Sequence, residues 1–109
     1  MTQPKNSTGT SLKETTKNKY RIRKTKKYKR DFKKLCASDQ YNIRKLNVVI
    51  NLLAKGSKLP SQYKNNRLKG EMINFEECHI APDWLLIYER HEDVLILTLQ
   101  RTGSHNDLF

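Results

Sequence analysis

Cysteine, proline and glycine are scarce in this chain of 109 residues. The two cysteines, Cys36 and Cys78, form neither a CxxC pair nor a Cys/His zinc ladder. The four glycines form no GxGxxG, P-loop or GxSxG sequence, which disfavours nucleotide-dependent enzymes. The longest apolar run covers residues 84–88, far short of the roughly 18 residues that a membrane-spanning helix needs. The sequence therefore predicts one small domain without a membrane partner, a disulfide framework or a small-molecule cofactor.

The N-terminus also lacks the apolar stretch of a secretory signal, which predicts a cytoplasmic protein. In a reducing cytosol both cysteines are expected to be buried as small hydrophobic residues. Residues 1–18 are mostly Thr, Ser, Asn, Lys and Gly and have little to bury. We expect them to form a flexible tail before a domain over residues 19–109.

Positive charge is concentrated at one end of the sequence. Of the net charge of +11, all falls in residues 1–35, where thirteen Lys and Arg face two acidic residues. Residues 36–109 carry nine basic and nine acidic side chains and are neutral. Such a field attracts polyanions, so nucleic acid or the ribosome is the expected partner, although a merely solubilising basic face fits the same composition.

The order of hydrophobic periods predicts an α+β fold. Tyr20 and Ile22 alternate with arginines, as in a short strand, and residues from Thr25 onward change to a helical period. A second helix is expected from a cap at Asp39 to Gly56. After a loop over residues 57–67, strands are expected at residues 68–73, 75–80, 84–88 and 94–99, with a turn at residues 91–93. Two N-terminal helices would then pack on one face of a mostly antiparallel sheet of four to five strands.

Histidine and arginine supply the candidate chemistry. His79 lies at a strand end four residues before Asp83, and Arg101 and His105 flank the end of the last strand. Cleavage of RNA through its 2′-hydroxyl needs a base, an acid and a cation for the phosphate, which imidazole and guanidinium provide. Two other interpretations remain open. The histidines could be structural residues in the core or at the edge of the sheet, or Cys78, His79, Asp83 and His105 could form a zinc site, although their spacing is not standard.

Three segments resemble the YafQ family of RelE/ParE-like toxins. They are LPSQYKNNRLKG at residues 59–70, CHIAPDWLLIY at residues 78–88 and QRTGSHNDLF at residues 100–109. The resemblance covers roughly residues 20–109. It implies a RelE-like sandwich and a toxin of a type II toxin–antitoxin system that cuts messenger RNA in the ribosomal A site without a metal. The implied partners are the ribosome with its 16S rRNA and a cognate antitoxin of the DinJ/RelB type.

The resemblance also implies roles for individual residues. His105 is the principal acid/base group, His79 and Asp83 assist proton transfer, and Arg101 holds the scissile phosphate. Phe109 stacks on a base, unless it is instead a hydrophobic end packed against Trp84. The basic face of the first helix is expected to bind RNA, through Lys26, Lys29, Lys33 and Lys34.

One position departs from the family pattern. Asn66 stands where the family has its first histidine, two residues before the leucine of L-x-G. An amide can bind phosphate but cannot exchange protons at neutral pH. The alternative function is therefore an RNA- or ribosome-binding module with weak or lost catalysis. A DNA-binding regulator is a third, weaker possibility, because no helix-turn-helix pattern is present.

Overall fold

A five-stranded mixed sheet carries the fold in the computed structural model, which describes residues 18–109. Residues 1–17, nearly all of the expected tail, lie outside the described part. The strand order is β1-β5-β4-β3-β2, and the β1–β5 pair is parallel while the other pairs are antiparallel. The elements in chain order are β1 Arg21–Lys24, α1 Lys26–Ala37, α2 Ile43–Ala54, η3 Ser61–Tyr63, β2 Asn66–Arg67, η4 Gly70–Met72, β3 Glu76–Ala81, β4 Trp84–His91, β5 Ile96–Gly103 and α3 His105–Leu108.

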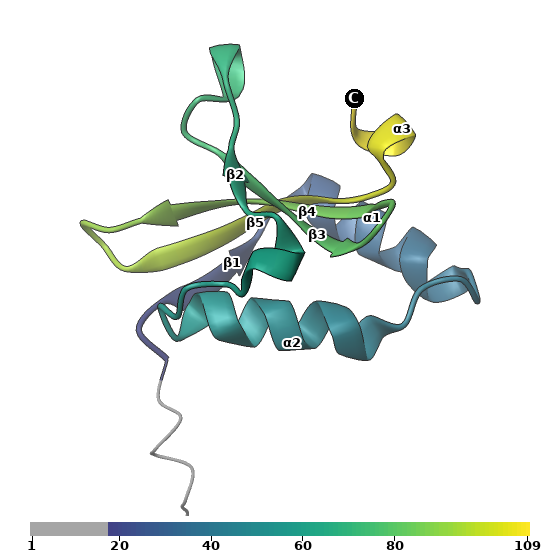
Figure 1. Cartoon of the computed structure of the whole chain (residues 1–109), viewed down its shortest axis with the longest axis horizontal. Coiled ribbons are helices and arrows are strands. Elements are labelled where there is room, and N and C mark those ends of the chain that lie inside the picture. Colours follow the sequence, from purple (N-terminus) through teal and green to yellow (C-terminus); the bar gives the residue numbers. More distant parts are fainter. Residues whose placement is uncertain (1–17) are drawn as a thin grey trace, which may run out of the picture.

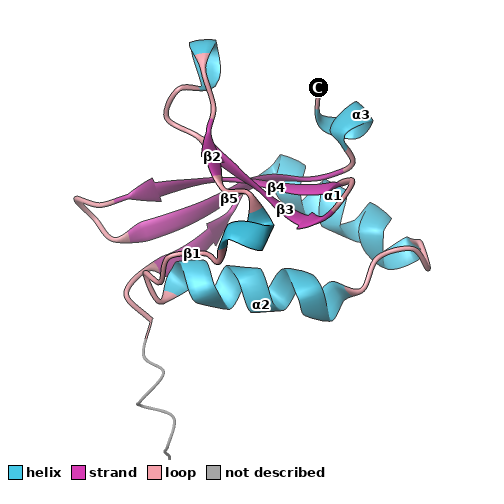
Figure 2. Ribbon diagram, in the orientation of Figure 1, coloured by secondary structure: helices cyan, strands magenta, loops and turns pink. Residues whose placement is uncertain are grey.

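Both long helices pack on one face of this sheet, which confirms the expected α+β arrangement (Figure 1). The core side chains from α1 and α2 form one cluster with those from β3, β4 and β5. The short helix α3 lies on the opposite side of the sheet from α2 (Figure 2). The buried cluster contains Tyr28, Leu35, Leu46, Val49, Ile50, Leu53, Cys78, Ile80, Trp84, Leu86, Tyr88, Leu97 and Leu99. One sheet face thus supplies the core, and the other is free of long helices.

The helix boundaries follow from local capping. Thr25 caps the N-terminus of α1, because its hydroxyl accepts a hydrogen bond from the Tyr28 N–H at 3.0 Å. The expected cap at Asp39 is wrong: the Asn42 side chain caps α2 by accepting from the Arg44 N–H at 3.0 Å. Gly56 follows the end of α2 with a φ of +82°, which confirms its predicted role as the glycine after the last turn.

Two expectations about strands are wrong. Residues 68–73 do not form a strand, since β2 is only Asn66–Arg67 and a 3-10 helix, η4, follows. The last strand begins at Ile96 and runs to Gly103, and Val94 and Leu95 lie exposed in the turn before it. Because β4 reaches His91, the turn that is expected at residues 91–93 covers residues 92–95 instead. The last strand is nevertheless central, between β1 and β4, as its apolar residues predicted.

The cysteines divide between core and surface. Cys78 is fully buried, as expected, but Cys36 is exposed near the C-terminal end of α1, so its predicted burial is wrong. Both thiols are free. Within residues 18–109, no helix is long and apolar enough to cross a membrane.

Candidate active site

The face of the sheet that carries no long helix presents a row of four side chains. Asn66 pairs with Glu77, Glu77 with Ile87, and Ile87 with Arg101 across β2, β3, β4 and β5. Directly paired residues of antiparallel strands project to the same face, so these four lie side by side. At a strand spacing of about 4.8 Å, the row spans about 14 Å from Asn66 to Arg101. Three of its four members are polar or charged.

The next row leads to the C-terminal helix. His79 pairs with Leu85, which pairs with Gly103 at the end of β5. His79 also lines a hollow of about 370 Å³ on the β3 side of the sheet, together with residues of α2, η3 and the following segment; these include Lys45, Tyr63 and Lys64. The His79 side chain is half-buried. The imidazole can therefore contact a ligand that lies across the sheet at this row.

Helix α3 is held at the end of β5 by local chemistry. Gly103 has a φ of +155°, and the side chains of Asp107 and Leu108 come within 3.5 Å of the position that a β-carbon would take there. Ser104 and Asp107 form a capping box, in which the Ser104 hydroxyl accepts from the Asp107 N–H at 3.2 Å. This turn places His105 and the chain end beside the sheet's free face.

Asp83 and Phe109 both meet His105. The backbone N–H of His105 donates to Asp83 Oδ1 at 3.2 Å, which ties the β3–β4 turn to the start of α3. The imidazole and the Phe109 ring have centroids 5.1 Å apart. Asp83 and His105, 22 positions apart in the sequence, therefore lie together. Phe109 is 56% exposed and does not pack on Trp84, so the hydrophobic-end interpretation is wrong.

Arg101 is fixed by an acidic residue from α1. Its Nε donates to Asp31 Oδ2 at 2.7 Å, and its Nη2 donates to Oδ1 at 3.1 Å. Asp31 Oδ2 also accepts from the Thr102 N–H at 3.1 Å, at a point of β5 beyond the end of β1. The hydrogen bond to Asp31 is the largest influence on Arg101 and raises its pKa, so the guanidinium stays charged.

The predicted basic residues of α1 do not all face this site. Lys34 lines a hollow of about 150 Å³ with Asp31 and Arg101, and Lys27 and Arg30 complete its wall. The other three expected RNA-binding lysines are exposed on a different stripe of the helix and are absent from that wall; they are Lys26, Lys29 and Lys33.

Sequence reasoning missed two acidic residues of the site. Glu77 stands two residues before His79 in β3, a spacing that puts both on one face of a strand. That alternation could have identified Glu77. Asp31 is the only acidic residue of α1, but its partnership with Arg101 joins positions 70 apart and depends on the tertiary fold.

The four residues considered for zinc do not converge. Cys78 pairs with Leu86 on the core face, whereas His79 beside it projects to the other face. Burial raises the pKa of the Cys78 thiol to about 12, which keeps it protonated and a poor metal ligand. Among the residues that the structure describes, no group of three or more His, Cys, Asp or Glu could hold a metal ion.

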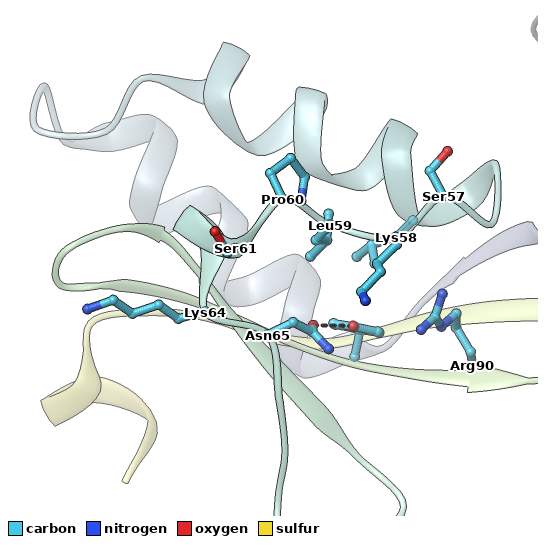
Figure 3. A pocket seen from close by; sticks show the side chains of 10 residues that line it. Ser57, Lys58, Leu59, Pro60, Ser61, Lys64, Asn65 and Arg90 are labelled. Atoms are coloured by element: carbon cyan, nitrogen blue, oxygen red, sulfur yellow. Dashed lines mark hydrogen bonds between the residues drawn. The ribbon is translucent and has the colours of Figure 1, made fainter.

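A further hollow of about 330 Å³ lies on the core side of the sheet, between β4 and the segment that follows α2 (Figure 3). Lys58 and Arg90 project toward it, and the Tyr88 hydroxyl donates to the Asn65 side chain at its floor. Tyr88 is fully buried and Trp84 nearly so, and both belong to the packed sheet. None of the candidate catalytic residues lines this hollow.

Comparison with known proteins identifies relatives over residues 20–109. A family described as "Bacterial toxin of type II toxin-antitoxin system, YafQ" matches residues 20–109. The mRNA interferase toxin YafQ of Escherichia coli K12 is 34% identical over 83 residues, which cover 75% of this chain and 87% of that protein.

Solved structures agree with the sequence match. The crystal structure of the E. coli DinJ-YafQ toxin-antitoxin complex is 30% identical, covers 84% of this chain and 98% of the other, and has a TM-score of 0.76. A copper-bound mutant toxin from Helicobacter pylori is 37% identical, covers 83% and 99% of the two chains, and also has a TM-score of 0.76.

Proposed function

The chain belongs to the YafQ family of type II toxin–antitoxin toxins and is an mRNA interferase, and we propose that it cuts messenger RNA on the ribosome without a metal. The protein then acts in the cytoplasm. Its antitoxin partner is of the DinJ type, by analogy with the complex formed by the E. coli relative.

The candidate site supplies the groups that the reaction needs. The RNA 2′-oxygen attacks the adjacent phosphorus, forms a new P–O bond, and displaces the 5′-oxygen of the next nucleotide. One imidazole takes the 2′-hydroxyl proton and another group protonates the 5′-oxygen. His105 is the principal proton-transfer group, and His79 and Asp83 assist it. Arg101 stabilises the charge that builds on the phosphorane.

RNA placement uses residues around these groups. Phe109 is exposed beside His105, where its ring can stack on a base. Asn66 lies at the far end of the row from Arg101 and can donate a hydrogen bond to phosphate. The exposed basic residues of α1 provide a field that captures the ribosome and its 16S rRNA; they are Lys26, Lys29, Lys33 and Lys34.

One observation carries the proposal: the backbone of His105 binds Asp83 and its ring lies beside Phe109, on the face of the sheet where Arg101 and His79 also lie. Residues far apart in the sequence are thus gathered at one edge. A purely structural rim would not need an exposed aromatic ring at the chain end.

Translation of a defined message with and without the protein, followed by primer extension, tests the proposal. Discrete cleavages within the translated region are expected, and the same message free of ribosomes should remain intact. Equal cutting of free and translated RNA would contradict ribosome dependence. Absence of cutting in both would contradict the enzyme function.

A binding module without catalysis is the second candidate, and Asn66 favours it. The family pattern places a histidine there, and its loss removes one proton-transfer group from the row. In that case the protein would bind the ribosome and slow translation without cutting. Ribosome binding with intact message would support this alternative.

A further inference from the structure

A stripe of basic residues on α1 faces the end of β5. Lys27, Arg30 and Lys34 stand at i, i+3 and i+7, which places them on one side of the helix. Together with Asp31 and Arg101 they line the hollow of about 150 Å³ described above, here called the α1 hollow. The three side chains are exposed, so a ligand can reach them from solvent.

The one acidic residue in the wall of the α1 hollow is already used. Asp31 is buried, and both its carboxylate oxygens accept hydrogen bonds from Arg101, while Oδ2 also accepts from the Thr102 N–H. These contacts involve Nε and Nη2 of Arg101 and not Nη1. Asp31 therefore fixes the guanidinium in place and leaves part of its donor edge for another acceptor.

The charge of the α1 hollow is unbalanced. Four cationic side chains surround one carboxylate. Within residues 18–109, Lys27, Arg30 and Lys34 take part in none of the ion pairs. A smaller adjoining hollow of about 80 Å³ includes Asp107, whose carboxylate is engaged in the capping box of α3. Such a surplus of positive charge around a small opening suits a phosphate group.

We propose that Lys27, Arg30 and Lys34 form, beside Arg101, a subsite for a backbone phosphate of the messenger RNA, next to the phosphate that is cleaved. The inference rests on the proposed function, because Arg101 belongs both to the α1 hollow and to the row of candidate site residues. RNA that follows the row from Asn66 toward Arg101 leads directly to this hollow. The subsite fixes the direction and register of the strand at the site.

Two matched triple variants test the subsite. One carries Lys27→Gln, Arg30→Gln and Lys34→Gln. The control carries Arg44→Gln, Lys55→Gln and Lys58→Gln. It also removes one arginine and two lysines, but from exposed positions on and after α2. Thermal unfolding of both checks that the fold is kept. The probe is a short single-stranded RNA with methylated 2′-hydroxyls, titrated against each protein at several salt concentrations.

The subsite triple should weaken RNA binding at least about tenfold at low salt and reduce the slope of log affinity against log salt by about 0.7, the value for one phosphate on a single strand. The control triple should change affinity less than about threefold. Equal losses in both triples, or RNA binding by the subsite triple as tight as native, would overturn the proposal. So would a loss seen with ribosomes but not with the short RNA, because the contact would then be to ribosomal RNA.

The readout is independent of cleavage. If native protein binds the probe through the α1 hollow but cuts no message, the subsite stands and the proposed enzyme function fails. If native protein cuts message and the subsite triple binds the probe normally, the enzyme function stands and the subsite fails.

Discussion

Loss of His105 should reduce cleavage strongly. This residue contacts both Asp83 and Phe109 and is the principal candidate for proton transfer. The His105→Ala variant should lower the single-turnover cleavage rate on programmed ribosomes at least about 100-fold, the lower range for one acid/base group. Arg101→Ala should have an effect of similar order, because the transition-state charge loses a cation.

His91→Ala is the matched control, since His91 lies at the far end of β4, with its Nε2 3.5 Å from Glu89 Oε1 on the same strand. Its cleavage rate should equal that of the native protein. A loss as large as that of His105→Ala would show that the assay responds to any histidine change and would remove the support for His105.

The two cysteines should differ in reactivity. Burial raises the pKa of Cys78 to about 12, whereas Cys36 is exposed. A thiol reagent at neutral pH should modify one cysteine per native chain and two after denaturation. Peptide mapping should place the native label on Cys36. Rapid labelling of Cys78 in the native protein would contradict its burial.

Burial of Cys78 and Tyr28 makes the free energy of unfolding decrease at alkaline pH. The pKa of Cys78 rises from 9.0 and that of Tyr28 from 10.0, each to about 12. Both groups ionise earlier in the unfolded chain, so their contribution to the free energy of unfolding is complete below about pH 9 and falls as pH rises toward 12.

Part of the site could be predicted from the sequence and part could not. His79, Asp83, Arg101, His105 and Phe109 were identified because motif segments resembling the family carry them. Asp31 could not be identified, because its partner lies 70 positions away and only the packing of α1 against β5 brings them together. A contact between residues so far apart cannot be predicted from local sequence.

At the scale of elements, the cap of α2 provides a direct test. Asn42→Ala should lower the free energy of unfolding by about 1 kcal/mol, because the Arg44 N–H loses its acceptor. Asp39→Ala, at the position expected from sequence, should change it by less than about 0.5 kcal/mol, as for an ordinary surface position. Chemical denaturation measures both. A larger effect at Asp39 than at Asn42 would contradict the observed start of the helix.

The elements also show where pattern reading fails. The helices were recognised because their apolar residues repeat over several turns. The sequence predicts too early a start for the last strand, because Val94 and Leu95 are apolar but lie in an exposed turn, with Leu95 at a φ of +54°. The pairing of β4 with β5 also shifts register between Ile87 and Tyr88. Neither the turn nor the shift has a signal in hydrophobic period alone.

At the scale of the whole molecule, the described residues offer imidazoles, a carboxylate and a guanidinium, which suit acid/base cleavage without metal. Toxin that has been treated with a chelator and dialysed should cut message on ribosomes at the native rate, with only the magnesium that the ribosomes need. If a transition metal were required to restore cleavage, the proposed mechanism would be wrong.

The pH profile of the single-turnover cleavage rate on programmed ribosomes tests the central claim most directly, compared between native protein, His105→Ala and Asn66→His. Native protein should cut, with a rate that depends on pH near neutrality. His105→Ala should lose that dependence with most of its rate, and Asn66→His should cut as fast as native or modestly faster. If native protein cuts no message at any pH and Asn66→His cuts it, the natural chain is a binding protein and the enzyme function is contradicted.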